Sequence, residues 1–510
     1  MAKRKGDKPP CGRNVHDAKK AKTRTCGSWA SLPAEICLMI LEEVSRQKYR
    51  GWASCAAVCK EWQALVERKN FRRLTLQVSC LDEFQYMVIR QRDLVQHICL
   101  NIELPQYTCR SCQYTESGSW SLREYYIARN AMVKLYSVLS TWQPAGRLIL
   151  EITACSPSDS QHWFKHYRFG PENDYGGDFA LSQDATTSRW HDPKHGWVNG
   201  QQVELPCTSA ILRVFSPLCV ITPKDLPEVH AVTGLMIRRQ LRRQIFLPTL
   251  QLLCQRLPRL ESIVYEPWRV WDSGDKMVED RELASIIRDV LPSHTRTVSI
   301  FEDFNDRLLL ALRSDMWDLL HLDTNPIADS MLVNAFASRS QGFEHFFMSY
   351  MIDARQFFNS CQPSYTWHHL KSLTLTSSIL TQAASQKEIS KLLCDASLAT
   401  LRMPRLEIMV FWNSTIQGEA CAVIYHRQAA YGQATLTWRG TWDLELSHEV
   451  VGAWQKVTSA SSRLEIKNER VEGVINSHGD AIHYLRLPSG IIDPVSLWQI
   501  RQEGMMEKVT

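Results

Sequence analysis

Six Cys and His side chains between residues 109 and 195 have types and spacings that could bind a metal. They form one CxxC pair and two His pairs whose members are four residues apart. Two Cys and two His in a tetrahedral arrangement make a structural zinc site, where the metal stabilises a fold and carries out no reaction. The residues are Cys109 with Cys112, His162 with His166, and His191 with His195.

The positions of these residues argue against a compact zinc finger. Roughly fifty residues separate Cys112 from His162, far more than the loop of a finger contains. Pro193 and Gly196 disfavour a helix through the second His pair. The sequence therefore favours loop cysteines and surface histidines, and predicts no metal ion and no other cofactor. A zinc-dependent domain after residue 71 is one alternative.

Sequence motifs typical of catalysis are missing. The chain has no GxxxxGK(S/T) phosphate loop, no GxGxxG after a strand, no nucleophile elbow and no HExxH. Pairs of carboxylates such as Glu302-Asp303 are typical of solvated helix or loop faces. We therefore expect a protein that is not an enzyme, with an unrecognised enzyme after residue 71 as a further alternative.

The composition indicates a globular protein in a reducing compartment. The chain has 510 residues, of which 44% are hydrophobic and 22% charged, enough for one small and one large domain. No apolar run is long enough to span a bilayer and the start of the chain is charged, so we expect no membrane partner and no secretion. The 16 Cys are scattered, which favours buried thiols over a disulfide framework.

Positive charge is concentrated in the N-terminal tail. Residues 1–26 contain nine Lys or Arg and two Asp, a net charge of +7, whereas the whole chain has +5. The remainder carries −2, which argues against a nucleic-acid-binding surface. We expect residues 1–28 to be a disordered basic tail. Its two basic clusters resemble a bipartite nuclear localisation signal, and a solvated basic arm explains them equally well. The cluster residues are Lys3, Arg4, Lys5, Lys19, Lys20 and Lys22.

Two amphipathic segments lie between Leu32 and Val66. Pro33 suits the first turn of a helix, and Glu35 places a negative charge at the positive end of the helix dipole. We expect one continuous helix in each segment, joined by a polar stretch that ends at Gly51. Such a hairpin is too small to bury all of its apolar side chains, so something else must cover them. The first segment contributes Ile36, Cys37, Leu38, Met39, Ile40, Leu41 and Val44, and the second contributes Cys55, Val58, Cys59, Trp62, Leu65 and Val66.

The same stretch contains three spaced matches to a known family. They are Leu32-Pro33-x-Glu35-Ile36, Ile40-Leu41 and Val58-Cys59-Lys60-x-Trp62. Over residues 29–71 the chain resembles the F-box, the short helical module that docks onto the Skp-family adaptor of SCF-type ubiquitin ligases. The resemblance implies that seven side chains face the adaptor or pack the hairpin, namely Leu32, Pro33, Ile36, Ile40, Val58, Cys59 and Trp62. The second helix departs from the family in its small residues Ala53, Ala56 and Ala57. An ordinary hairpin inside a larger core is the alternative.

Residues 72–510 alternate between β-type and helical runs, which predicts an α/β fold with a largely parallel sheet. The expected strands are 73–78, 95–104, 147–153, 260–266, 297–301, 343–350, 370–376 and 406–412. The expected helices are 81–91, 122–139, 241–256, 281–290, 328–337, 354–358 and 386–396.

Several strand runs share three apolar anchors with the same internal spacing. The pattern resembles a degenerate leucine-rich repeat, which implies an irregular strand-helix solenoid whose parallel strands line a concave, protein-binding surface. A compact α/β domain is the alternative because the period is irregular. The second anchors of successive units are Ile263, Val298, Phe346, Leu373 and Met409.

Two segments depart from the alternation. Residues 156–209 form a long irregular insertion with interspersed aromatic residues, which is either part of the substrate-recognition surface or an outer lobe that only fills space. Residues 415–510 are expected to form a partly antiparallel C-terminal cap, with Trp438 and Trp442 on one face. The strands expected in this cap are 422–425, 434–438 and 441–446.

The resemblance implies a substrate-recognition subunit of an SCF-type ubiquitin ligase. The F-box would bind a Skp-family adaptor and, through it, a cullin-RING ligase, while the α/β region would bind an unknown protein substrate. Chemistry would belong to other subunits, and the receptor would hold the substrate near the ubiquitin carrier. The order of basic tail, F-box and α/β region resembles uncharacterised F-box proteins of filamentous fungi, and a nuclear or cytoplasmic location is expected. An F-box scaffold that binds the adaptor without a cullin is the alternative.

Overall fold

The computed structural model describes residues 32–46, 51–170, 190–218, 226–316, 327–415, 418–428, 432–458 and 463–506. Both candidate nuclear-signal clusters lie outside these residues. Contacts divide the chain into two units, Met1–Val66 and Glu67–Thr510. The first unit contains helix α1 (Ala34–Arg46), a 3-10 helix (Trp52–Ala57) and the start of α2 (Lys60–Arg72).

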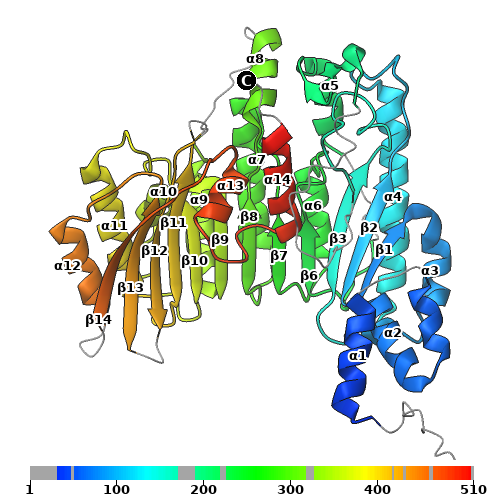
Figure 1. The fold of residues 1–510 in the computed structure, drawn as a ribbon, viewed down its shortest axis with the longest axis horizontal. Helices are drawn as coiled ribbons and strands as arrows, with labels where there is room; N and C mark the ends of the chain where they lie inside the picture. Colours follow the sequence, from blue (N-terminus) through cyan, green and yellow to red (C-terminus); the bar gives the residue numbers. More distant parts are fainter. Residues whose placement is uncertain are drawn as a thin grey trace, which may run out of the picture. The chain divides into compact units, whose positions relative to one another are not determined.

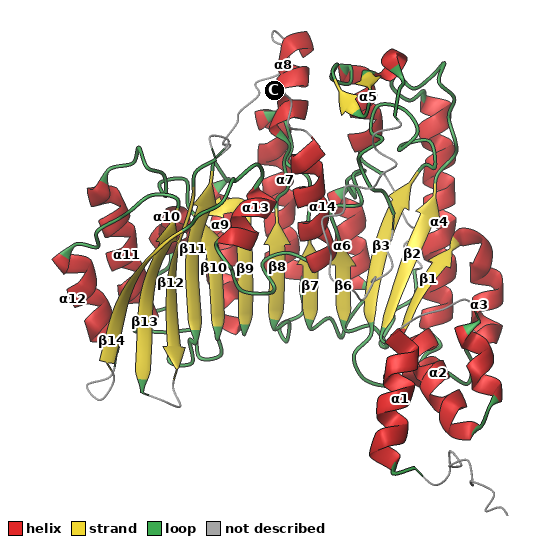
Figure 2. Cartoon of the chain, viewed as in Figure 1, coloured by secondary structure: helices red, strands yellow, loops and turns green. Residues whose placement is uncertain are grey.

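The second unit is built on one large sheet (Figures 1 and 2). Its strands are β1 (Arg73–Gln77), β2 (His97–Glu103), β3 (Ile149–Cys155), β6 (Gly234–Ile237), β7 (Ser262–Tyr265), β8 (Thr297–Phe301), β9 (His345–Asp353), β10 (Ser372–Thr376), β11 (Ile408–Ser414), β12 (Ala420–Gln428), β13 (Gln433–Gly440) and β14 (Arg463–Arg470). These strands pair in chain order, and all pairs from β1 to β11 are parallel. Strand β12 is antiparallel to β11 and β13, and β14 is parallel to β13. The mixed α/β fold with a mostly parallel sheet is therefore confirmed.

Helices connect most of the successive strands. They are α3 (Leu81–Met87), α4 (Gly118–Leu139), α5 (Thr208–Phe215), α6 (Leu247–Gln255), α7 (Ser273–Ser285), α8 (Asp306–Met316), α9 (Ser330–Arg339), α10 (Ala354–Ser360), α11 (Gln386–Thr400), α12 (His448–Val457), α13 (His478–Tyr484) and α14 (Pro494–Met506). Short strands β4 (Trp197–Val198) and β5 (Gln201–Gln202) form a separate hairpin.

The predicted repeat anchors form one row across the sheet. Ile263 pairs with Val298, Val298 with Phe346, Phe346 with Leu373, and Leu373 with Met409. All five side chains are at most 3% exposed. Because parallel neighbours keep their register whatever the length of the connection between them, the irregular sequence spacing reflects connections of different length.

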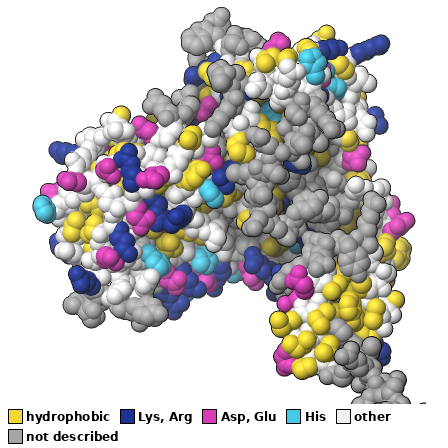
Figure 3. All heavy atoms as spheres, in the orientation of Figure 1, with side chains coloured by type: hydrophobic (Ala, Val, Ile, Leu, Met, Phe, Trp, Pro, Cys, Tyr) yellow, Lys and Arg dark blue, Asp and Glu magenta, His cyan; other side chains and the backbone are white. Residues whose placement is uncertain are grey.

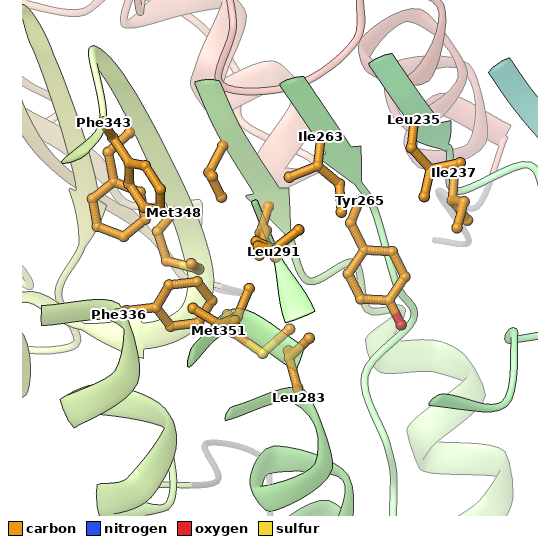
Figure 4. Packing of buried hydrophobic residues seen from close by; sticks show 14 of the residues in the cluster. Leu235, Ile237, Ile263, Tyr265, Leu283, Leu291, Phe336, Phe343, Met348 and Met351 are labelled. Carbon is orange, nitrogen blue, oxygen red and sulfur yellow. The ribbon is translucent and has the colours of Figure 1, made fainter. Parts of the chain in front are cut away.

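Alternate strand side chains pack against the connecting helices on one face of the sheet. In Figure 4, Met348 of β9 lies close to Phe336 of α9, and Met351 of β9 lies close to Leu283 of α7. Side chains buried this fully contribute about 1.5–3 kcal/mol each to folding. This apolar layer forms the main core of the second unit.

The opposite face of the middle strands is covered by the C-terminal segment. Helices α13 and α14 lie in front of the sheet in Figure 1, and Ile482 and Ile500 share a buried cluster with Phe347. Ser299 Oγ donates a hydrogen bond of 2.7 Å to the carbonyl of Gly490. A Cβ at Gly490 would lie 2.8 Å from the Phe347 ring, so only glycine permits this approach. Over these strands, the sheet face expected to bind other proteins is occupied by the protein's own chain.

Most expected strands and helices are confirmed to within a few residues, with three corrections. Residues 441–446 are not a strand, because the chain turns after β13 and the Trp442 carbonyl accepts a 3.0 Å hydrogen bond from Trp438 Nε1. The helix expected at 241–256 begins at Leu247, since the preceding arginines form a buried charged segment. Strands β4, β5, β6 and β14 and helices α5, α8, α12, α13 and α14 were not expected.

Candidate functional site

Among the described residues of the first unit, six large apolar side chains are exposed. Leu38 and Met39 are 54% and 64% exposed, and Val58 is 65% exposed. Figure 3 shows hydrophobic side chains gathered over α1. Several large apolar side chains exposed in one small unit are uncommon on soluble proteins and are typical of a binding surface. We call this set the apolar face; its members are Leu32, Ile36, Leu38, Met39, Ile40 and Val58.

The first unit buries few of its apolar residues. Leu41 and Val66 are 3% and 1% exposed, and no other large apolar side chain of this unit is fully buried among the residues described. The α1 helix begins with a hydrogen bond of 3.1 Å from the Cys37 amide to the carbonyl of Pro33. The unit therefore cannot cover the apolar face from within.

The second helix differs from the continuous helix that we expected. A 3-10 helix ends at Ala57, where the Val58 amide bonds the carbonyl of Cys55 at 3.2 Å, and α2 begins only at Lys60. The break places Val58 and Cys59 outside both helices, and both are exposed.

The second unit brings the CxxC pair together with one His from each predicted pair. Ligand atoms of Cys109, Cys112, His162 and His195 all lie within 4.8 Å of one another. Cys109 and Cys112 lie in the loop after β2, as expected, although Cys112 is only 2% exposed. The expectation of a surface histidine is wrong for His195, which is 3% exposed, and His162 is half-buried. Cys112 follows β2 and His162 follows β3, and these neighbouring parallel strands end at the same edge of the sheet. The fold thus closes the long sequence gap. His191, by contrast, is exposed.

A groove of about 1190 Å³ lies where β8 to β11 end. We call it the strand-end groove. Its lining includes Tyr350 and Asp353 from β9, Asn413 from β11, and Ile500 and Glu503 from α14.

Tyr350 has an unusual backbone in the strand-end groove. Its φ is 63°, in the left-handed region that residues with a side chain rarely adopt, next to an irregular register between β9 and β10. The Tyr350 amide donates to Thr376 Oγ1 at 2.6 Å, and its hydroxyl lies 2.8 Å from Ser414 Oγ. Strained residues held in this way concentrate at binding sites.

Comparison with known families identifies the first unit. Residues 29–77 match a family described as F-box-like. The chain is an F-box protein. F-box domains are protein-interaction modules that generally bind Skp-type adaptors, and the domain itself is typically non-catalytic.

A second family model matches a part of this F-box protein that lies after the F-box. Residues 290–493 match a family of unknown function, DUF6546, which includes β8 to α13. No curated protein matches the chain. Among the helices that the structure describes, none is both long enough and apolar enough to cross a membrane.

Within the F-box, most of the seven predicted adaptor-facing residues are accessible. Leu32, Ile36 and Ile40 are 38%, 41% and 38% exposed. Pro33, Val58 and Cys59 are also exposed, and Trp62 is half-buried. Their contact with an adaptor stays a prediction. Two further candidates, Leu38 and Met39, were not included, although the apolar character of α1 around its circumference is the signal that marks them.

The carboxylates expected on a solvated face are buried. Glu302 is 3% and Asp303 0% exposed. Glu302 pairs with Arg269 at 3.0 Å and with Lys276 at 3.3 Å. Asp303 pairs with Arg239 and with His478, the latter at 2.8 Å. Burial alone would raise the pKa of Asp303, but the Arg239 guanidinium and the hydrogen bond with His478 hold it well below its ordinary value.

A buried charge network joins α14 to the sheet. Arg239 binds Glu503 through two hydrogen bonds of 3.0 and 2.7 Å, and Arg242 binds the same carboxylate. The Arg242 guanidinium also stacks on the ring of Tyr167, 3.8 Å from its centroid. Arg238 pairs with Glu151 of β3 and, at 3.0 Å, with Asp493 just before α14. The sequence signal is the run of four Arg between positions 238 and 243 directly after β6.

Proposed function

We propose that this F-box protein is a substrate receptor of an SCF-type ubiquitin ligase. The observation that carries the proposal is the apolar face, which the F-box cannot bury by itself. Four of its six members, Leu32, Ile36, Ile40 and Val58, are positions that the family resemblance assigns to the adaptor interface. A Skp-family adaptor would cover them, and a cullin-RING ligase would join through the adaptor.

The exposed side chains are large enough to contribute measurable affinity. Burying a Val, Leu or Ile side chain contributes about 1.5–3 kcal/mol relative to leaving it exposed. Association also costs free energy, because the partners lose translational and rotational freedom. A few well-buried anchor side chains therefore decide whether the complex is stable. The apolar face therefore supplies the anchors that a stable adaptor complex needs.

We further propose that the second unit is an irregular leucine-rich-repeat-like solenoid that binds a protein substrate. Pairing of the strands in chain order and the single row of repeat anchors support this architecture. Since α13 and α14 cover the face of the middle strands, we assign substrate binding to the strand-end groove. Acidic and basic side chains both line it, including Asp353, Arg355, Glu388 and Lys391.

The proposed receptor acts by proximity. It would hold the substrate close to the charged ubiquitin carrier and raise the effective concentration of the reacting lysine. No catalytic step is assigned to this chain. A nuclear or cytoplasmic location fits this role.

Affinity capture with a variant of the apolar face tests the proposal. The variant combines Leu32→Ala, Ile36→Ala and Val58→Ala, which remove exposed side chains and leave the buried Leu41 and Val66 in place. Each truncation should remove about 1 kcal/mol or more of interface free energy, so adaptor binding should weaken on the order of 100-fold.

The matched control is Val474→Ala, because Val474 is 68% exposed and Val58 is 65% exposed. The wild type and the control should recover adaptor, cullin and substrate, whereas the triple variant should recover substrate alone. Equal recovery of the adaptor by all three proteins would contradict the proposal. Recovery of the adaptor without a cullin would favour a scaffold outside the ligase.

A further inference from the structure

The cluster of Cys109, Cys112, His162 and His195 has the donor set of a structural zinc site, and we propose that it binds one zinc ion. His195 Nε2 lies 3.4 Å from Cys109 Sγ and 3.3 Å from Cys112 Sγ. In a tetrahedral site with Zn–S near 2.3 Å and Zn–N near 2.0–2.1 Å, sulfur and nitrogen ligand atoms are about 3.6 Å apart. The observed distances are within a few tenths of an ångström of this value.

Each histidine has one ring nitrogen held by the protein and the other available to a metal. His195 Nδ1 lies 2.7 Å from the Asp192 carboxylate, which also pairs with Lys165 at 3.1 Å. This contact places the proton on Nδ1 and leaves the Nε2 lone pair toward the thiols. The His162 ring hydrogen-bonds the backbone of Tyr107. Its Nε2 is buried without a hydrogen-bond partner in the described chain, as expected for a metal ligand.

The surroundings are partly aromatic, and four protein ligands leave no open coordination position. The rings of His162 and His195 are 4.9 Å apart, and Trp163 packs edge-on against His195 at 5.6 Å. Four protein ligands fill the shell, which is the arrangement of a structural site and not of a catalytic one. Two sulfur and two nitrogen donors in tetrahedral geometry favour zinc over calcium or magnesium.

Zinc at this position would hold together three segments that have little regular structure. Cys109 and Cys112 follow β2, His162 follows β3, and His195 ends a short 3-10 helix (Pro193–His195) before the β4-β5 hairpin. The same segments are tied by a 3.0 Å hydrogen bond from Trp197 Nε1 to the carbonyl of Trp163. Gly196, with φ 72°, allows the tight turn after His195, where a Cβ would lie 2.3 Å from the carbonyl of Glu204. Under this proposal, zinc joins the described parts of the insertion, residues 156–170 and 190–209, to the loop after β2.

Metal analysis of the purified full chain tests the proposal directly. Protein purified without chelators should contain about one zinc per chain. After removal of zinc under reducing conditions, cobalt should bind and give the visible bands of a tetrahedral site with thiolate ligands. Cysteine-labelling should show Cys109 and Cys112 protected in the zinc form and reactive in the apo form.

Variants locate the zinc on these residues. Cys112→Ser and His195→Ala should each lose the bound metal, whereas the controls Cys80→Ser and His191→Ala, both at exposed positions, should retain it. Asp192→Asn keeps all four ligands and should weaken zinc binding about 10- to 100-fold. This variant keeps the test decisive if loss of a ligand prevents folding.

Three results would overturn the proposal. They are protein without stoichiometric zinc that also fails to bind cobalt, a Cys109–Cys112 disulfide in protein isolated under reducing conditions, and unchanged zinc content in Cys112→Ser. None of these measurements depends on adaptor binding, so this proposal and the receptor proposal can fail separately.

Discussion

Glu503 should be the residue on which attachment of α14 to the sheet depends most strongly. Its carboxylate pairs with both Arg239 and Arg242, and all three side chains are at most 5% exposed. Replacing Glu503 by Gln keeps the shape and removes the charge. Arg239 then still forms its ion pair with Asp303. Arg242, however, loses the one carboxylate that pairs with it in the described chain.

The magnitude follows from the cost of an unpaired buried charge. Breaking a buried ion pair by removing one partner costs about 3–5 kcal/mol. Burial already lowers the pKa of Arg242, and its Nε and Nη1 have no hydrogen-bond partner among the described residues. Because Arg239 remains paired, we expect a cost at the lower end of this range, about 3 kcal/mol. This cost corresponds to an increase on the order of 100-fold in the equilibrium constant for local opening of α14.

Amide hydrogen exchange of peptides from residues 494–506 measures this opening. Glu503→Gln should increase exchange there by the stated factor, with smaller changes in β10 and β11. The control is Asp443→Ala, which breaks an ion pair with Arg470 whose side chains are 70% and 52% exposed. Such exposed pairs contribute about 0–1 kcal/mol, so the control should leave exchange of α14 unchanged. Unchanged protection of α14 in Glu503→Gln would refute the reasoning.

Two further predictions concern acid stability and location. Burial would raise the pKa of Glu151, but Arg238 and His97 lower it from 4.5 to about 2, so its contribution to the free energy of unfolding is present above about pH 4.5 and is lost as the pH falls toward 2. Urea unfolding across this range should show a flatter acid limb for Glu151→Gln than for wild type, and parallel curves would contradict this. A fluorescent reporter fused to residues 1–28 should enter the nucleus and lose this behaviour when the cluster at 19–22 is changed to Ala; a cytosolic wild-type fusion would remove the hypothesis.

Local sequence patterns predicted the repeat strands well, because an apolar residue at a fixed position within a strand indicates a buried side chain. The anchors Ile263, Phe346 and Met409 are apolar at fixed positions within their strands, and the parallel ladder places them in one row. In the F-box, the surplus of apolar residues predicted an exposed face for the same reason. Leu38 and Met39 were left out of the predicted adaptor-facing set because that set followed the family pattern and not the distribution of apolar residues around α1.

Features that depend on contacts distant in sequence were not predictable in this way. Glu302 and Asp303 have the local appearance of solvated acids, and their partners include Arg239 and His478, the latter 175 residues away. The Cys and His cluster was discounted on sequence separation, which is meaningful for a finger folded from one continuous segment. Sequence separation carries no such meaning where the ligands follow adjacent parallel strands. The fold brings the ends of these strands together, whatever the length of the connection between them.

The direction of the strands explains why both proposed sites lie at the same edge of the sheet. Parallel strands share one carboxyl edge, and in open α/β sheets ligands bind in crevices beyond that edge. Here the connections after β2 and β3 carry the Cys and His cluster, and those after β8 to β11 form the strand-end groove. Helices cover one face of the sheet and the C-terminal segment covers the middle of the other. Under the proposed receptor function, substrate recognition is therefore expected at the strand ends, where Tyr350 is held in a strained conformation, and not on the sheet face that a leucine-rich-repeat horseshoe would use.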